Sequence, residues 1–557
     1  MTAQQHETQT PPRAGLTGIR PAGDRAVLIE LPSLDAVLSL QAQLTAHPQP
    51  GQIDVIAAAE TVLVTADSPE TARALAAHVR SLDLEAPAET ESTLVTIDVV
   101  YDGEDLDEVA ALTGLDRGGV VAAHTGQLWT AAFAGFAPGF AYLTGQDSSL
   151  EVPRRRSPRT AVPAGAVALG GAYSAVYPRQ SPGGWQLIGR TDAAMWDLGR
   201  ESPALVRPGD TVRFNAVRAQ ATVTHHQQSS AGAASKEAQA TEGLAVRKPG
   251  LQSTIQDLGR PGYASLGVSS AGAMDRGALR RANRLVGNGE GDAGIELLFG
   301  GLELVALSDQ VLAVTGAAVP LEITPPDEPR DGDEKRTTAV RHPVCDAPFA
   351  LLAGERLTVG TPTAGLRSYV GVRGGLGGAE ALGSRSTDTM SGIGPEPLQA
   401  GAILPVRAPR PGSIVGHPEV SALPDRNEAT VLRVVPGPRQ DWFSGETLQE
   451  FLQQEWTVTP QSSRIGLRLN GQPLTRCRDG ELASEGTVRG AVQVPPEGQP
   501  VLFLSDHPVT GGYPVIAVVV HADLDKAAQL PPGTTVRFAA ATLPAELPET
   551  PKESPHA

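Results

Sequence analysis

The sequence predicts a mainly β protein made of two related halves, with a small α/β subdomain at the start of the first half. Gly and Pro are frequent, at 61 and 47 of 557 residues, and apolar runs are short, which favours many short strands joined by turns. Strand and helix patterns alternate near the N-terminus, and three motifs recur in the same order in both halves. The chain is too long for one hydrophobic core, so we expect several domains.

The α/β subdomain is expected over residues 16–92. Ser68 has the side chain of a helix N-cap, and Pro69 fits the first turn that follows it. The order βαββαβ indicates a ferredoxin-like sandwich. The expected strands are 26–31, 53–58, 61–66 and 95–101, and the expected helices are 34–45 and 69–82.

Short strands with dense Gly and Pro punctuation fill most of the remaining sequence, interrupted by a polar stretch without periodicity. A charged insertion at 325–341 is expected to be an exposed loop. The predicted division is disordered tails at 1–15 and 542–557, a β domain at 93–216, a linker at 217–243, a β-barrel-like subdomain at 244–428 and a β domain at 429–541.

The internal repeat consists of Gly-Ala-Val, then Gly-Gly-aromatic, then Pro-Gly-x-Thr-Val-Arg-Phe. These motifs start at Gly165, Gly183 and Pro208 in the first half, and at 490, 511 and 532 in the second. Their order is kept and their spacings differ by only a few residues, so we predict one domain type in both halves. Chance similarity among Gly-rich strands is the alternative. We expect the two Gly-Gly-aromatic strands to face a shared small-molecule site.

The charge balance limits the classes of partner. A formal net charge of −17 and a pI near 5.2 argue against nucleic acid and anionic membrane. Only five residues are Lys, so an anion site is expected to use Arg, whose planar fork binds carboxylate or phosphate through two bonds. The two Cys and the His pattern lack zinc-ligand spacing, and the polar N-terminus lacks a secretory signal, so we expect a cytoplasmic protein without a metal site.

Two segments of the first half combine Gly, aromatic and Arg residues. In the segment 133–145, three Gly alternate with aromatic residues, which suits either a ligand pocket or a tight turn packed in a core. The segment 152–165 carries four Arg between Pro residues, which suits either an anion site or a solvated loop. His124 precedes both and is either an acid/base group or a structural residue. The sequence contains no P-loop, no dinucleotide fingerprint and no nucleophile elbow.

Longer motifs resemble the carboxyltransferase-domain family, whose two units are known as allophanate hydrolase subunits 1 and 2. The resemblance covers about residues 16–541. The motifs of the first unit are GFAPGFAYLTG, PRRRSPRTAVPAG and YPRQSPGGWQLIGRT, and those of the second are TIQDLGRPGY, SAGAMDRGAL, ANRLVGN, GSRSTDT, SRIGLRL and TGGYPVIAV.

The resemblance implies cyclophilin-like β-barrels in both halves. Similar proteins are the B-type and C-type components of an ATP-dependent 5-oxoprolinase, which opens 5-oxo-L-proline to L-glutamate with a third subunit. Others are the carboxyltransferase part of urea carboxylase and regulators of a sporulation histidine kinase. The chain lacks biotin carboxylase, carrier and biotin-attachment motifs, so we expect the fused B/C component of 5-oxoprolinase. A carboxyltransferase acting with separate biotin proteins and a non-catalytic kinase regulator are the alternatives.

The expected cofactor is ATP with Mg²⁺, and the expected partners are the third, A-type component of 5-oxoprolinase and a small amide; assembly of several copies is left open. Departures such as Ala166 and Ser463 put the substrate in question and leave the fold untouched. The catalytic candidates are His124, Asp257, Asp275 and Asp506, and the substrate- or anion-binding candidates are Arg159, Arg190, Arg385, Arg468, Gly139, Gly183, Gly184, Gly511 and Gly512.

Overall fold

The chain folds into four bodies that belong to two units. The computed structural model describes residues 15–84, 92–155, 157–218, 243–326, 339–480 and 482–541. The predicted tails and linker lie almost entirely outside these residues. The first unit contains the N-terminal subdomain (15–84) and the first barrel (92–218), and the second unit contains the two-sheet subdomain (243–428) and the second barrel (430–541).

The N-terminal subdomain is a four-stranded antiparallel sheet in the order β1-β2-β4-β3. The hydroxyls of Ser33 and Ser68 cap its helices by accepting hydrogen bonds from Ala36 N (3.3 Å) and Thr71 N (3.1 Å). Its elements are β1 (Gly18–Pro21), β2 (Ala26–Glu30), α1 (Leu34–Ala46), β3 (Gln52–Ala57), β4 (Thr61–Ala66) and α2 (Pro69–Ser81).

The predicted strand at 95–101 forms, but it belongs to the first barrel and not to the N-terminal sheet. As β5 (Leu94–Val99) it pairs in parallel with β13 (Thr211–Ala216), and its side chains Ile97 and Val99 enter the core of the barrel. The ferredoxin-like order βαββαβ is therefore wrong in its last strand. The apolar residues that alternate along β5 pack between β13 and the helices of the first barrel.

The first barrel is a seven-stranded sheet in the order β12-β9-β10-β7-β6-β13-β5. Val100 and Arg190 join its two end strands through reciprocal backbone hydrogen bonds of 2.9 Å, which close the sheet. Its other elements are α3 (Leu106–Thr113), α4 (Arg117–Thr125), β6 (Trp129–Ala134), β7 (Ala141–Gly145), η1 (Ser148–Leu150), β8 (Arg159–Val162), β9 (Ala166–Gly170), β10 (Tyr173–Val176), β11 (Ser181–Gly183) and β12 (Gln186–Arg190).

In the two-sheet subdomain, two five-stranded sheets enclose one apolar core. The orders are β19-β21-β17-β14-β23 and β15-β16-β22-β18-β20. The elements are β14 (Leu244–Pro249), β15 (Gln252–Gln256), η2 (Ala264–Leu266), α5 (Arg276–Val286), β16 (Gly294–Leu298), β17 (Leu302–Ala306), β18 (Gln310–Ala318), β19 (Leu321–Thr324), β20 (Pro348–Leu351), β21 (Arg356–Val359), β22 (Ala364–Val372) and β23 (Ile403–Leu404).

The second barrel is closed, in the order β24-β31-β28-β29-β26-β25-β32. The mainly β fold predicted for both halves is thereby confirmed. The elements are β24 (Thr430–Pro436), η3 (Gln440–Trp442), α6 (Gly445–Gln453), β25 (Trp456–Val458), β26 (Gly466–Asn470), β27 (Glu485–Gly486), β28 (Ala491–Gln493), β29 (Val501–Phe503), β30 (Thr510–Gly511), β31 (Val515–Val519), η4 (His521–Asp523), α7 (Leu524–Ala528) and β32 (Thr535–Ala540).

The predicted repeat is confirmed by topology. The nine strands β5 to β13 of the first barrel correspond in sequence order to the nine strands β24 to β32 of the second, and corresponding strands have the same neighbours. The parallel pair of the first barrel (β5 and β13) corresponds to that of the second (β24 and β32), and the small hairpin of β8 and β11 corresponds to that of β27 and β30. The repeated Pro-Gly turn has the same conformation in both copies, with φ of 91° at Gly209 and 87° at Gly533. Glycine is required there because other residues rarely adopt positive φ.

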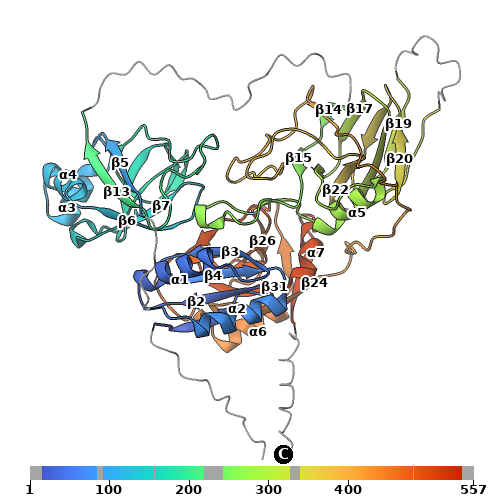
Figure 1. The fold of residues 1–557 in the computed structure, drawn as a ribbon. Coiled ribbons are helices and arrows are strands. Elements are labelled where there is room, and N and C mark those ends of the chain that lie inside the picture. Colours follow the sequence, from blue (N-terminus) through green and yellow to red (C-terminus); the bar gives the residue numbers. More distant parts are fainter. Residues whose placement is uncertain are drawn as a thin grey trace, which may run out of the picture.

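The N-terminal subdomain, which belongs to the first unit, packs against the second barrel, which belongs to the second unit (Figure 1). Both helices of the N-terminal subdomain cover one face of its sheet. The other face carries Leu28, Ile56 and Leu63, which are at most 4% exposed because Ala264 and Val509 of the second unit cover them. The contact is close, since a Cβ atom added at Gly486 would lie 2.6 Å from the Cβ of Leu63.

We predict that Leu63→Ala loosens the contact between the units. Deleting a fully buried Leu side chain should lower the free energy of unfolding by about 2–5 kcal/mol, and hydrogen exchange should rise in β27, which faces Leu63. Leu40→Ala is the matched control, because Leu40 is equally buried inside the N-terminal subdomain itself. Equal exchange in β27 of both variants would contradict the prediction.

Candidate functional site

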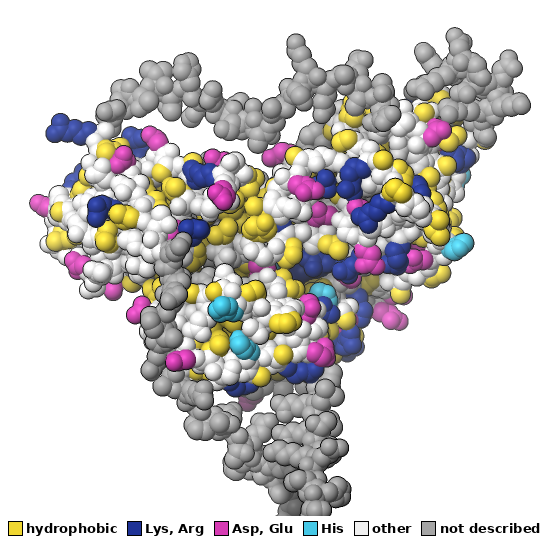
Figure 2. Space-filling view, in the orientation of Figure 1, with side chains coloured by type: hydrophobic (Ala, Val, Ile, Leu, Met, Phe, Trp, Pro, Cys, Tyr) yellow, Lys and Arg dark blue, Asp and Glu magenta, His cyan; other side chains and the backbone are white. Residues whose placement is uncertain are grey.

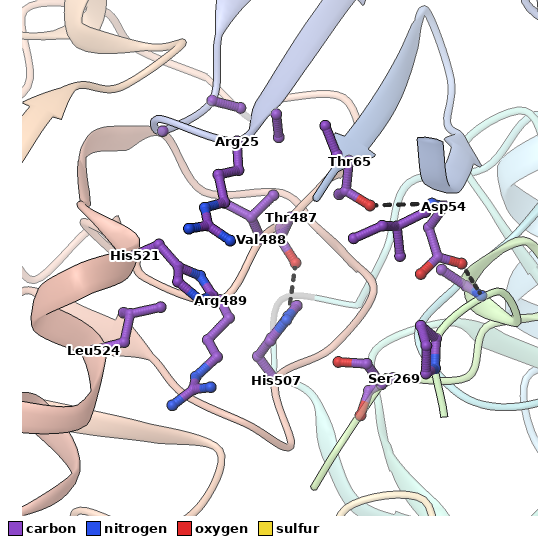
Figure 3. A pocket seen from close by; sticks show the side chains of 18 of the residues that line it. Arg25, Asp54, Thr65, Ser269, Thr487, Val488, Arg489, His507, His521 and Leu524 are labelled. Atoms are coloured by element: carbon purple, nitrogen blue, oxygen red, sulfur yellow. Dashed lines mark hydrogen bonds between the residues drawn. The ribbon is translucent and has the colours of Figure 1, made fainter. Parts of the chain in front are cut away.

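A cavity of about 370 Å³ lies where three of the four bodies meet. Its walls come from the N-terminal subdomain, from the segment before and at the start of α5, and from the second barrel (Figure 3). This volume is within the range of small-molecule sites, roughly 300–1,000 Å³. The cavity is composite, because both units supply its lining.

Four arginines line the cavity: Arg25, Arg276, Arg280 and Arg489. Arg25 comes from the N-terminal subdomain, Arg276 and Arg280 lie one turn apart on α5, and Arg489 precedes β28. The Nε atoms of all four are shielded from solvent and have no hydrogen-bond partner within the described part of the chain, although that of Arg280 lies 3.6 Å from the Glu290 carboxylate. Donors left unbonded in this way are available to a bound anion.

The positive charges of Arg276 and Arg489, two arginines of the cavity, are only weakly neutralised by other groups of the protein. Arg276 donates to the Ala271 carbonyl (3.4 Å) and Arg489 to the Met274 carbonyl, and among the described residues neither forms an ion pair with a carboxylate. Burial lowers the pKa of Arg276, and the charges of Arg489 and Arg280 lower it further. Burial also lowers the pKa of Arg489. Three aspartates, Asp24, Asp54 and Asp67, also line the cavity, so four arginines face three carboxylates and the remaining positive charge would be stabilised by a bound anion.

Two histidines face the same space. Burial lowers the pKa of His507 to about 4, helped by Arg489 and Arg276, and burial lowers that of His521 to about 4. His507 Nδ1 donates to the Pro508 carbonyl at 2.8 Å, which leaves Nε2 as the atom that can take a proton. Both rings are neutral at pH 7.

Local structure explains how Arg276 reaches the cavity. It is the first residue of α5, whose N-cap Asp275 accepts a hydrogen bond from Ala278 N at 2.7 Å. The first two amides of the helix, of Arg276 and Gly277, donate to the Asp525 carboxylate at 3.0 Å. These amides are already occupied, so side chains and not the helix terminus must bind an anion here.

The carboxylates of the predicted catalytic residues Asp257, Asp275 and Asp506 accept hydrogen bonds from backbone amides and side chains of neighbouring segments. Asp257 accepts hydrogen bonds from the Ser384 and Ser386 hydroxyls and from Arg385 N. Asp506 accepts from Arg464 and from Thr389. Asp275, besides capping α5, accepts from Gln529. None of these three carboxylates is in the cavity lining, although His507, the neighbour of Asp506, is.

The arginine candidates also lie away from the cavity. Arg159 pairs with Asp105 at 2.8 Å and with Glu104 at 3.1 Å, and Arg190 pairs with Asp102 at 2.9 Å. Arg385 pairs with Glu380 at 2.7 Å, and Arg468 is exposed on β26. Their motifs are present, but the structure brings none of these guanidinium groups to the composite cavity.

The predicted glycines lie at contacts between the units or at positions where neighbouring atoms leave little room for a side chain. Gly139 has a φ of 77° and donates to the Leu266 carbonyl of the second unit at 3.2 Å. A Cβ atom at Gly183 would lie 2.3 Å from the Tyr177 hydroxyl, and one at Gly511 would lie 2.6 Å from Gln493. Gly184 and Gly512 follow them with more room. No residue of either Gly-Gly pair is in the cavity lining, and a site between the two Gly-Gly-aromatic strands stays a prediction.

His124 lies inside the first barrel. Its Nδ1 bonds to the Tyr101 hydroxyl (2.7 Å) and its Nε2 to the Ser174 hydroxyl (2.8 Å), and its ring stacks on Phe214 at 4.3 Å. Burial lowers its pKa to about 3. In the second barrel the corresponding pair is Phe451 stacked on Phe538. An apolar ring in the equivalent place favours a packing role for His124, and a catalytic role stays an untested prediction.

The repeat explains why only the second barrel contributes to the cavity. In the motif alignment, Arg489 corresponds to Ala164, and His521 corresponds to Ala193. The first barrel therefore has alanine at two positions where the second has groups that line the cavity, whereas the counterpart of His507 is Arg179. Sequence reasoning missed Arg25, Arg276, Arg280 and Arg489; one usable signal was that Arg489 directly precedes the repeated Gly-Ala-Val motif.

The described residues contain no group of three or more His, Cys, Asp or Glu side chains arranged to hold a metal ion. None of the helices in these ranges combines the length and the apolar composition needed to cross a bilayer. Lys and Arg side chains gather at the boundary between the body that carries α5 and the bodies below it, where the cavity lies (Figure 2).

Comparisons with known proteins match both units. The family described as carboxyltransferase domain, subdomain C and D, matches residues 17–206, and subdomain A and B matches residues 266–540. The C-type component of 5-oxoprolinase from Escherichia coli is 36% identical over 303 residues, which is 54% of this chain and 92% of that protein. The B-type component of 5-oxoprolinase from Bacillus subtilis is 35% identical over 189 residues, which is 31% of this chain and 79% of that protein.

A solved structure covers both units together. The crystal structure of TTHA0988 superposes with a TM-score of 0.79 at 33% sequence identity, and the match covers 92% of this chain and 99% of that one. The arrangement of both units in a single chain therefore has a structural counterpart.

We predict that anion binding near pH 5 takes up protons. A bound anion raises the pKa of His507 from about 4, so affinity should increase as pH falls through the raised value. Calorimetric titration with sulfate in buffers of different ionisation enthalpy measures the uptake. His507→Gln should reduce it, whereas His124→Gln, which changes a buried His outside the cavity, should not. Unchanged uptake in His507→Gln would refute the assignment.

Proposed function

Because the chain belongs to the carboxyltransferase-domain family, with one unit like the B-type component and one like the C-type component, we propose that it is the fused B/C component of an ATP-dependent 5-oxoprolinase. In this role it would help to open 5-oxo-L-proline to L-glutamate. A separate A-type component would complete the enzyme, since the relatives are named as subunits.

One observation carries the proposal: guanidinium groups from both units converge on one cavity, and their Nε atoms have no hydrogen-bond partner among the described residues. 5-Oxoproline carries a carboxylate, which accepts bidentate hydrogen bonds from arginine. Arg25 comes from the unit like the B-type component, and Arg276 and Arg489 come from the unit like the C-type component. Such a site is complete only when both units are present, which supports a role for the two units as one component.

The chemistry also requires stabilised negative charge. A lactam is a resonance-stabilised amide, and ATP would supply the phosphoryl group that turns its oxygen into a leaving group. The arginines of this chain would hold the substrate carboxylate and stabilise charge that develops at the reacting oxygen. His507 Nε2 is a neutral group in the cavity that can accept a proton.

The residues present fit an anionic group and supply no metal site of their own. The unbonded Nε atoms suit a carboxylate or a phosphoryl oxygen equally. The described residues hold no acidic cluster for Mg²⁺, so a magnesium ion would arrive with the nucleotide phosphates.

The family description favours a second candidate, a carboxyltransferase acting with separate biotin proteins. Carboxyl transfer to a small amide also passes through negative charge on oxygen, which the same arginines would stabilise. The two candidates differ in what they need: 5-oxoprolinase needs ATP and a third component, whereas the carboxyltransferase needs a biotinylated carrier.

A reconstitution assay tests the proposal. The chain is mixed with its cognate A-type component, ATP, Mg²⁺ and 5-oxo-L-proline, and glutamate is measured. We expect glutamate only when all components are present. Absence of ATP-dependent glutamate would sink the proposal, and carboxylation of an amide that depends on added biotinylated carrier would favour the second candidate.

We further predict that Arg489→Gln lowers kcat/KM of the reconstituted enzyme by about 10²–10³-fold, as expected for losing one charge-stabilising donor. Arg537→Gln is the matched control, because it removes the same charge from an exposed position on β32. An effect of similar size in both variants would show that the cavity arginine is not part of the site.

A further inference from the structure

The segment 272–275 joins Ser270 to Arg276, two residues that line the cavity, and the turn at its start has an unusual conformation. Ala271 has a φ of 47° and Gly272 a φ of 86°, so the chain reverses through two left-handed residues. For Ala this conformation costs roughly 1 kcal/mol or more. The surroundings must therefore stabilise the turn.

Side chains from other elements bind five of the eight backbone N–H and C=O groups of this segment. Arg464 donates to the Gly272 carbonyl at 2.7 Å and Ser505 to the Ala273 carbonyl at 3.2 Å. Met274 N donates to Glu296 at 2.8 Å, and Asp275 N donates to the Tyr369 hydroxyl at 2.7 Å. The Met274 carbonyl accepts from Arg489, which itself lines the cavity.

Arg464 connects this segment to two buried carboxylates. It is buried, and its guanidinium contacts the Asp506 carboxylate at 2.8 and 2.9 Å, the Glu296 carboxylate and the Gly272 carbonyl. Arg367 lies 3.7 Å from Glu296, so two cations and two carboxylates balance in a dry environment. Removing one member of a buried network leaves the others uncompensated.

We infer that Arg464, Glu296 and Asp506 are positioning residues for the anion site, acting through the backbone of 272–275 on Arg276 and Arg489. None of the three is in the cavity lining, so they cannot act by touching the ligand. Arg464 and Asp506 belong to the second barrel and Glu296 to the two-sheet subdomain, so the network also fixes the two bodies that carry Arg489 and Arg276. A purely stabilising ion network is the opposing explanation.

The inference rests on the proposed function only for the assignment of the cavity as the site, and its test needs no enzymatic activity. Sulfate is titrated into the full chain by calorimetry, and unfolding is measured in parallel. Arg464→Lys keeps the charge but cannot bond in three directions, and Glu296→Gln keeps the shape but loses the charge. We expect each to weaken sulfate binding by about tenfold or more, as loss of supporting groups does at metal sites.

The matched control is Arg439→Lys. Arg439 also lies between two carboxylates, Glu30 and Glu485, at the contact between the units, but it does not touch the 272–275 segment. It should lower the free energy of unfolding and leave sulfate affinity unchanged. Equal loss of affinity in Arg439→Lys and Arg464→Lys would overturn the inference.

A double-mutant cycle separates positioning from stability. Arg464→Lys should couple with Arg489→Gln, because both side chains hold the same segment, whereas with Arg25→Gln, which comes from the other unit, its effects should add. Additive effects in both cycles, or wild-type affinity in Arg464→Lys, would overturn the positioning role. Failure of glutamate formation with the coupling intact would instead remove the proposed function and leave this inference standing.

Discussion

A four-stranded sheet with both helices on one side leaves an apolar face that water would otherwise solvate. Here that face carries Leu28, Ile56 and Leu63, and the second unit covers it. Burying such side chains is worth about 1.5–3 kcal/mol each. The resulting contact between the two units forms the cavity, and it places Arg25 of the first unit and Arg489 of the second in the lining of that cavity. The N-terminal subdomain is thus a structural cover and a wall of the site at the same time.

The local elements and the duplication could be predicted because their signals are local. Ser68 followed by Pro69 marks a helix start wherever it packs, and repeated Pro-Gly turns need positive φ in either barrel. The assignment of β5 failed because its apolar alternation fits any sheet. Partner choice depends on β13, which lies more than a hundred residues away in the sequence.

The site itself could not be located because it depends on the contact between units. Motif density directed attention to Arg159 and Arg190, but acidic residues that are distant in sequence, Asp105 and Asp102, already pair with them. An arginine whose charge is already paired with a carboxylate binds a ligand anion less strongly, and the sequence does not report that distance. Asp506 was identified as important from its motif, and the structure gives it a supporting position beside the cavity and not inside it.

The covered sheet face has a consequence for assembly. Relatives of the two units are named as distinct subunits, and distinct subunits must meet by diffusion and separate on dilution. In a single chain the same docking is intramolecular, at an effective concentration set by the connecting residues and independent of how much protein is present. Both halves are also synthesised in equal number. A covalent connection thus gives a moderate apolar contact the permanence of an obligate one, so that the cavity persists at any protein concentration.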